Sequence, residues 1–173
     1  MIRPFIIAAM TADGFIAKDA NHAAFWTSKE DKARFVELTK RAGVVVMGSQ
    51  TYKTLPRPLA ERVNIVYSRN KNFDGAETTQ DEPHVLLAKL EARGLKEVAI
   101  CGGAQIYSMF MKAKVVDKLY LTIEPLLFGK GITLFKEDLL ADLTLLSHTK
   151  TEGGTVLLEY KVEYHNAQRL NTT

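Results

Sequence analysis

Two glycine-bearing junctions have the composition of a phosphate site. Gly102-Gly103 follows a short apolar run at 98–101 and precedes residues with helical spacing, and Gly48 stands in the same relation to an apolar run at 44–47. A strand that leads into a helix through glycine turns the unpaired N–H groups of the helix start toward the crevice beyond the strand. A tight connection without a ligand explains the glycines equally well, because the full G-x-G-x-x-G pattern is absent.

Asp31 is the carboxylate best placed to act on a ligand. Ser28 predicts the start of a helix that ends near Arg41, with Gly43 just beyond it. Asp31 lies one turn before Phe35, on the face that should look at the core. There it could sit at the edge of an apolar pocket and bind a pair of N–H donors. Capping of the helix start is the alternative, and the spacing from Ser28 favours capping.

The order of the expected elements indicates how these residues come together. Strands are expected at 5–10, 44–47, 64–67 and 98–101, separated by helices from 28, 49, 81 and 104, and strands alone are expected at 118–123, 143–149 and 156–164. This order predicts a three-layer α/β/α domain with a mostly parallel central sheet and an antiparallel C-terminal hairpin. The strand ends after Met10, after Met47 and at Gly102 could then converge on one crevice.

Composition excludes several other classes of protein. The chain has 173 residues, 46% apolar and 25% charged, the mixture of one globular domain, which we expect at 1–165 with a flexible tail at 166–173. The net charge of +3 is too small to argue for nucleic acid. One cysteine excludes a cysteine-rich zinc site, and we expect no metal. No apolar run approaches the ~20 residues of a membrane span, and no signal-peptide layout opens the chain, so we expect a cytoplasmic protein.

Six motifs spread over nearly the whole length are informative together. They are Ile7-Ala8-Ala9-Met10; Trp26 with Asp31, Phe35 and Thr39; Met47-Gly48-Ser49-Gln50-Thr51-Tyr52; Pro58-Leu59 with Arg62 and Asn64; Gly102-Gly103 with Ile106-Tyr107; and Leu119-Tyr120-Leu121-Thr122. In this order the chain resembles the dihydrofolate reductase family, in the superfamily that also holds the reductase domain of riboflavin synthesis. The resemblance implies a small-molecule substrate and NADPH-dependent reduction of 7,8-dihydrofolate to tetrahydrofolate, in one-carbon metabolism. We expect a monomer or a homodimer.

The same resemblance implies the substrate site. Asp31 would bind the amide edge of the pterin and support protonation at N5, and Arg62 would meet the carboxylate of the glutamate tail. Catalytic roles are implied for Asp31, Trp26 and Thr122. The substrate contacts would come from Ala8, Ala9, Asp31, Phe35, Leu55, Leu59, Arg62, Cys101, Tyr107 and Thr122.

For the cofactor, the resemblance implies NADPH and a cis peptide bond between Gly102 and Gly103. The helix from Ala104 would receive the pyrophosphate, and Trp26 would close a lid. The contacts would come from Ala9, Ile16, Ala17, Gly48, Ser49, Gln50, Thr51, Ser68, Arg69, Cys101, Gly102, Gly103, Ala104, Gln105, Ile106 and Tyr107.

Two departures from the family pattern keep alternatives open. Many members have arginine where this chain has Ser49, so Ser68 and Arg69 would have to bind the 2′-phosphate. Residues 11–17 and 123–135 resemble the riboflavin-type reductases instead. An NADPH-dependent reductase of a ribosylaminopyrimidine phosphate is therefore the second hypothesis, and a nucleotide-binding module without catalysis is the third.

Overall fold

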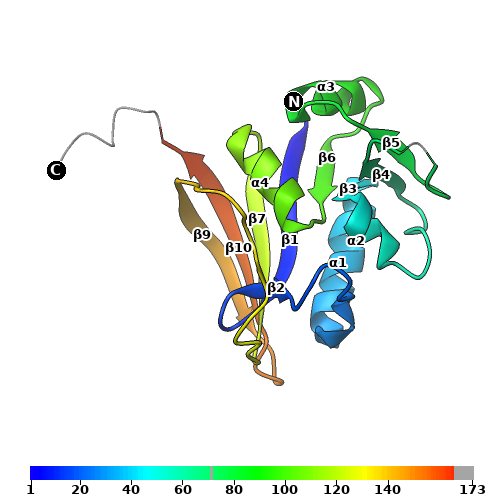
Figure 1. Ribbon diagram of the computed structural model, residues 1–173. Coiled ribbons are helices and arrows are strands. Elements are labelled where there is room, and N and C mark those ends of the chain that lie inside the picture. Colours follow the sequence, from blue (N-terminus) through cyan, green and yellow to red (C-terminus); the bar gives the residue numbers. More distant parts are fainter. Residues whose placement is uncertain (71, 166–173) are drawn as a thin grey trace.

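The computed structural model describes residues 1–70 and 72–165, so the predicted tail lies outside the described residues. Its centre is an eight-stranded sheet with the order β5-β4-β3-β6-β1-β7-β10-β9 (Figure 1). The strands are β1 (Arg3–Thr11), β3 (Val44–Gly48), β4 (Val63–Tyr67), β5 (Glu77–Thr79), β6 (Glu97–Ile100), β7 (Lys118–Glu124), β9 (Ala141–Lys150) and β10 (Val156–Tyr164).

Strand directions confirm the predicted sheet. β1 pairs in parallel with both β6 and β7, and the parallel pairing continues through β3 and β4 to β5. β10 is antiparallel to β7, and β9 is antiparallel to β10 at the edge. The hairpin expected around residues 152–154 is therefore the antiparallel end of a mostly parallel sheet.

Helices cover both faces of this sheet and complete the three layers. They are α1 (Lys29–Ala42), α2 (Ser49–Lys53), α3 (Pro83–Ala92) and α4 (Ala104–Lys112). Successive side chains of a strand point to opposite faces. Ile6 accordingly packs with residues of α3 and α4, whereas its neighbour Phe5 packs with Leu38 of α1. Burial on both faces explains why the central strands are continuously apolar.

Helix α1 begins and ends where the sequence predicts. The Ser28 hydroxyl accepts a hydrogen bond from the Asp31 N–H at 3.2 Å. At the other end, Gly43 adopts the left-handed conformation with φ 74°, and its N–H donates to the carbonyls of Thr39 and Lys40. These local caps fix the position of Asp31 in the first turn.

Three short strands have no counterpart in the sequence prediction: β5, β2 (Phe15–Ala17) and β8 (Ile132–Thr133). β2 pairs antiparallel with β8, which ties the segment before Trp26 to the loop after β7. Asp13 strengthens this tie, because its carboxylate accepts hydrogen bonds from the N–H groups of Phe128 and Gly129. Strands of two or three residues are too short to show a periodic pattern.

Within the described ranges, no helix is both long and apolar enough to cross a membrane.

Candidate active site

A cavity of about 740 Å³ opens where the carboxyl ends of β1, β3, β4 and β6 meet. This is the edge at which open α/β sheets bind ligands. The structure brings all but four of the predicted site residues to its wall. Those on the wall are Ala8, Ala9, Ile16, Ala17, Trp26, Asp31, Phe35, Gly48, Ser49, Gln50, Thr51, Ser68, Arg69, Cys101, Gly102, Gly103, Ala104, Gln105, Ile106 and Tyr107.

Two glycine junctions form one side of the cavity and touch each other. The Gly48 N–H donates to the Gly102 carbonyl at 2.8 Å, and the Gly102–Gly103 peptide is cis, as the resemblance implied. A Cβ at Gly48 would lie 3.2 Å from Ile106 Cγ1, and one at Gly103 would lie 3.3 Å from Thr51 Oγ1. Any residue larger than glycine at Gly48 or Gly103 would therefore crowd its neighbours at this side of the cavity.

The same junctions supply donors for an anion. α2 starts directly after Gly48 and α4 directly after Gly103, and no described side chain caps either helix. The first N–H groups of a helix have no partner within it, and the helix dipole adds partial positive charge there. The cavity wall at Ser49 and Ala104 therefore suits a phosphate or a pyrophosphate group.

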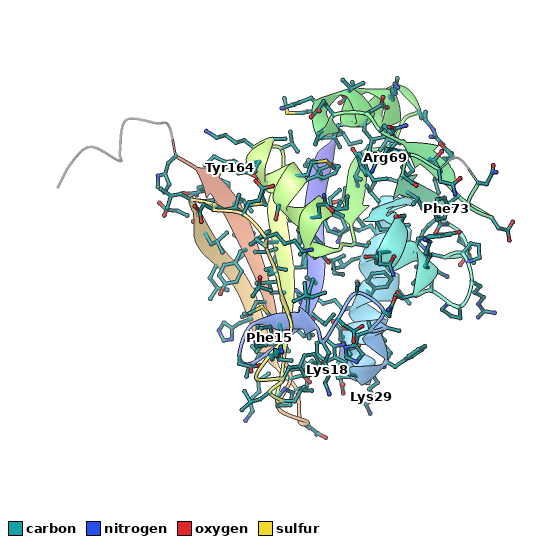
Figure 2. The ribbon with its side chains drawn as sticks, in the orientation of Figure 1. Phe15, Lys18, Lys29, Arg69, Phe73 and Tyr164 are labelled. Carbon is teal, nitrogen blue, oxygen red and sulfur yellow. The ribbon has the colours of Figure 1, made fainter. Side chains whose placement is uncertain are left out.

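Ser68 and Arg69 lie at the end of β4, with Thr79 and Gln80 beside them on the cavity wall. Figure 2 labels Arg69 at this side of the molecule. The Ser68 N–H donates to the Thr79 carbonyl at 3.2 Å, so pairing with β5 shapes this corner. Sequence reasoning missed Thr79 and Gln80, because β5 is too short and polar to be recognised as a strand.

Asp31 occupies the opposite side of the cavity, with Phe35 one turn further along α1. Burial raises the pKa of the Asp31 carboxyl group, and the hydroxyls of Thr122 and Thr27 oppose that rise. The negative charge of Glu124 raises this pKa further, and the positive charge of Arg34 lowers it. Asp31 is therefore an acid that holds its proton to a higher pH than an exposed aspartate does.

The capping interpretation of the Asp31 carboxylate is wrong. In a capping box the third helical residue accepts a hydrogen bond from the backbone N–H of the cap residue. Here the Ser28 N–H donates instead to the Glu124 Oε1 atom of β7, at 2.8 Å. Only the backbone of Asp31 takes part in the cap, and its carboxyl group lines the cavity.

Trp26 lines the cavity at the end of a 3₁₀-helix, η1 (Ala24–Trp26). Its ring stacks with His22 at a centroid distance of 6.4 Å and meets the Phe128 ring edge-on at 5.0 Å. The indole Nε1–H is buried and finds no hydrogen-bond partner among the described residues. A buried donor without a partner is costly, so the Trp26 indole is held at the cavity wall by its aromatic contacts and not by a hydrogen bond within the described chain.

Cys101 and Tyr107 lie between the two sides of the cavity. Burial raises the pKa of the Cys101 thiol and raises the pKa of Tyr107 well above its usual range. The Tyr107 hydroxyl donates to the Ile7 carbonyl at 2.7 Å. Both side chains are therefore neutral, and Asp31 faces neutral groups on this wall.

Four predicted residues, Leu55, Leu59, Arg62 and Thr122, do not line the cavity. Thr122 is buried behind Asp31 on β7. Leu55 and Leu59, like Phe35, are partly buried and pack against the core on the α1 face. Arg62 donates to Thr39 Oγ1 and to the Ala60 carbonyl, both at 2.8 Å, beside the C-terminal half of α1.

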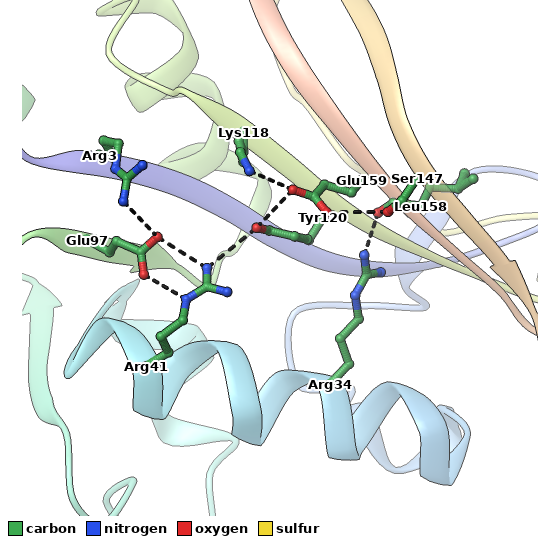
Figure 3. Close-up of polar contacts among 9 residues, drawn as sticks. All are labelled: Arg3, Arg34, Arg41, Glu97, Lys118, Tyr120, Ser147, Leu158 and Glu159. Atoms are coloured by element: carbon green, nitrogen blue, oxygen red, sulfur yellow. Dashed lines mark hydrogen bonds and ion pairs between the residues drawn. The ribbon is translucent and has the colours of Figure 1, made fainter.

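Arginines hold α1, and with it Asp31, against the sheet (Figure 3). The half-buried Arg34 donates to the carbonyls of Leu121 and Leu158, on adjacent strands, at 3.0 and 2.7 Å. Arg41 pairs with Glu97 at 2.7 Å near the other end of the helix. The Asp31 side of the cavity is therefore mounted on a helix tied to the sheet along its length.

Comparisons with known proteins agree with this geometry. A model of the family described as dihydrofolate reductase matches residues 4–154. The dihydrofolate reductase type 3 of Salmonella typhimurium is 33% identical over 117 residues, which cover 68% of each chain. The dihydrofolate reductase of Staphylococcus haemolyticus is 30% identical over 118 residues, which cover 68% of this chain and 67% of the relative.

Two solved structures share the fold of this chain at low sequence identity. A pyrimidine reductase-like protein from Corynebacterium diphtheriae matches with a TM-score of 0.80 at 18% identity, covering 95% of this chain and 93% of that one. A Thermotoga maritima deaminase/uracil reductase matches with a TM-score of 0.76 at 15% identity, covering 93% of this chain and 56% of that one. Such low identity shows a shared fold alone. The family model and the sequence relatives identify the chain as a member of the dihydrofolate reductase family, and so as an oxidoreductase that uses a nicotinamide cofactor.

Proposed function

We propose that this protein reduces 7,8-dihydrofolate to 5,6,7,8-tetrahydrofolate with NADPH. The observation that carries the proposal is Asp31, a partly buried carboxyl group with a raised pKa that faces a cavity beside Phe35. Its two oxygens can accept the paired N–H donors of a pterin, which fixes the ring in one orientation. NADPH would supply the hydride for C6, and Asp31 would support delivery of the accompanying proton to N5.

Residues on the other side of the cavity would hold the cofactor. The N–H groups at the starts of α2 and α4 would bind its pyrophosphate, next to Gly48 and Gly103. Ala9, Ile16 and Ala17 would border the nicotinamide, and Ser68 and Arg69 would bind the 2′-phosphate. Trp26 would close the lid over both ligands.

The preference for NADPH over NADH depends on Arg69 in this proposal. Replacing Arg69 with Ala removes the cation that faces the 2′-phosphate, so we expect the ratio of kcat/KM for NADPH to that for NADH to fall by about tenfold or more. The rate with NADH should change little. Steady-state kinetics with both cofactors measure this ratio, and an unchanged ratio would place the 2′-phosphate contact elsewhere.

The glutamate tail of dihydrofolate would run along α1. Asp31 and Thr39 are eight residues apart on the helix, which corresponds to about 12 Å at 1.5 Å per residue. Arg62 is held beside Thr39 by two hydrogen bonds. Leu55 and Leu59 form an apolar edge on this side, which suits the aromatic ring between the pterin and the glutamate. A guanidinium group so oriented can bind a carboxylate with two parallel hydrogen bonds.

Replacing Arg62 should weaken binding of the glutamate tail but not of the pterin. We expect Arg62→Ala to raise the KM for dihydrofolate by about tenfold or more, because a charge-assisted contact is lost. The KM for a dihydropterin without the glutamate tail should stay nearly constant. Arg57→Ala, at a nearby exposed arginine, is the matched control. Equal losses with both substrates would show that Arg62 has only a structural role.

One observation favours a second candidate, an NADPH-dependent reductase of a ribosylaminopyrimidine phosphate. The loop after β7, which resembles the riboflavin-type reductases in sequence, is joined to the lid through β2 and β8. A substrate with a phosphate group would, however, need a cation to meet that phosphate, and the two groups between Asp31 and the glycine junctions, Cys101 and Tyr107, are neutral. The aspartate side of the cavity therefore favours dihydrofolate.

A direct assay separates the two candidates. NADPH oxidation is followed by absorbance with dihydrofolate and, in parallel, with the aminopyrimidine ribosyl phosphate. We expect turnover with dihydrofolate and none above background with the other compound. The reverse result would overturn the proposed function, and no turnover with either would favour a binding module.

A further inference from the structure

We propose that Glu124 is a positioning residue for Asp31: it takes over the capping contact at the start of α1 and places a second carboxylate behind the substrate side of the cavity. The inference rests on the proposed function, because it assigns Glu124 to the proton-supplying group of that reaction. The loop that follows Glu124 belongs to the segment that departs from the dihydrofolate reductase pattern, so the family resemblance does not supply this role.

Glu124 is built into the interior as an acceptor. It is only 2% exposed, at the end of β7. Its Oε1 atom accepts hydrogen bonds from the N–H and the hydroxyl of Ser28, both at 2.8 Å, and its Oε2 atom accepts one from the Thr155 hydroxyl at 2.9 Å. Both oxygens of the Glu124 carboxyl group are therefore held by groups that can donate hydrogen bonds.

The contact with Ser28 determines what Asp31 can do. An acidic side chain at the third helical position ordinarily folds back to the cap residue, where the helix dipole stabilises its charge. Glu124 occupies that place, and the Ser28 hydroxyl that donates to Glu124 also accepts from the Asp31 N–H. The Asp31 backbone is thus fixed through Ser28, and its carboxyl group faces the cavity.

Charge gives Glu124 a second effect on Asp31. The ionisable groups around Asp31 are Arg34 on α1, Tyr107 on α4 and Glu124 on β7. Tyr107 is neutral, so the two charged neighbours act against each other: Glu124 raises the pKa of Asp31, and Arg34 lowers it. Glu124 and Thr122 are two residues apart on β7, so both face α1. The carboxylate therefore makes protonation of Asp31 easier from a buried position that no substrate occupies.

Glu124→Gln tests this role, because glutamine keeps an acceptor for Ser28 and removes the charge. The effect of this charge on the Asp31 midpoint is measured by ¹³C NMR titration of the Asp31 carboxyl carbon in the protein without ligands. The Asp31 signal is assigned from its absence in Asp31→Asn. We expect the Asp31 midpoint to move to lower pH in Glu124→Gln. Dihydrofolate reduction at neutral pH should slow by about three- to tenfold and recover at acid pH, since one pH unit is tenfold in the protonated fraction.

Controls distinguish charge from structure. Glu97→Gln removes a carboxylate that pairs with the far end of α1, and Thr155→Val removes one hydrogen bond to Glu124 but keeps its charge. Both should leave the Asp31 midpoint unchanged. If Glu124→Gln does not fold, the contact is tested from its other end. Ser28→Ala removes the hydroxyl that joins Glu124 to the Asp31 N–H and leaves both carboxyl groups in place, so Asp31 should lose its fixed position and the KM for dihydrofolate should rise by about three- to tenfold.

The two proposals fail in different ways. An unchanged Asp31 midpoint in Glu124→Gln overturns the inference whether or not the protein reduces dihydrofolate, and an unchanged KM for dihydrofolate in Ser28→Ala overturns it in a protein that does. A shifted midpoint in a protein that does not turn over dihydrofolate supports the coupling and overturns the proposed function instead.

Discussion

Asp31→Asn is expected to lower the rate of dihydrofolate reduction at neutral pH by about a hundredfold or more, the usual worth of a positioned acid or base. Asparagine has one acceptor oxygen, so it loses the bidentate contact with the pterin, and it cannot exchange a proton with the substrate. NADPH binding should be nearly unchanged, because Asp31 lies across the cavity from the glycine junctions. Single-turnover kinetics and a fluorescence titration with NADPH measure the two effects separately.

The pH profile sharpens this prediction. The raised pKa of Asp31 keeps the acid available to a higher pH than an exposed aspartate would, and the rate should fall as pH rises through that raised value. The variant should recover part of its rate at acid pH, where the substrate is already protonated. Glu30→Gln, in the same helical turn but off the cavity wall, is the control and should keep the full rate. An unchanged rate in Asp31→Asn would exclude both roles given to this carboxylate.

Asp31→Asn should lose activity without losing stability. A carboxyl group whose pKa is higher in the folded than in the unfolded protein favours folding when protonated, and this contribution is lost as pH rises through the folded pKa. At neutral pH the ionised group is therefore unfavourable where it stands. We expect the midpoint of thermal unfolding to stay the same or to rise, so a loss of rate cannot be assigned to unfolding.

The framework of the site could be predicted because its signals are local. Ser28 and Gly43 bound α1 within a few residues, and the apolar runs at β3 and β6 reflect burial on both faces of the sheet. Once strands and helices alternate, parallel pairing places the Gly48 and Gly102 junctions at the same edge. The convergence of the glycines on one cavity follows from that order.

The environment of Asp31 could not be predicted because its partners are remote in sequence. Ser28 and Glu124 are 96 residues apart, and only the finished sheet brings them together. From the local pattern, Ser28 followed by Asp31 is indistinguishable from an ordinary capping box. β2 and β8 were missed for the same reason: each exists only through pairing with the other.

Gly102→Ala is expected to abolish measurable NADPH binding and to lower stability. Gly102 has a φ of +108°, where a side chain is strained at a cost of roughly 1–3 kcal/mol. A Cβ there would also lie 3.1 Å from the Tyr107 hydroxyl oxygen and 3.2 Å from its Cζ atom. Tyr107 cannot easily move away, because it is buried and its hydroxyl donates to Ile7 in the central strand.

Gly94→Ala separates backbone strain from damage to the site. Gly94 has a φ of +84° at the end of α3, and a Cβ there would meet nothing within 4 Å. Both variants should lose stability in chemical denaturation, and Gly102→Ala should lose more because of its contact with Tyr107. Only Gly102→Ala should lose the cofactor, measured by NADPH fluorescence. If Gly102→Ala bound NADPH as tightly as Gly94→Ala does, the pyrophosphate would have to bind away from this junction. The cavity has a second uncapped helix start, at α2, and Gly48→Ala would then be the variant to lose the cofactor.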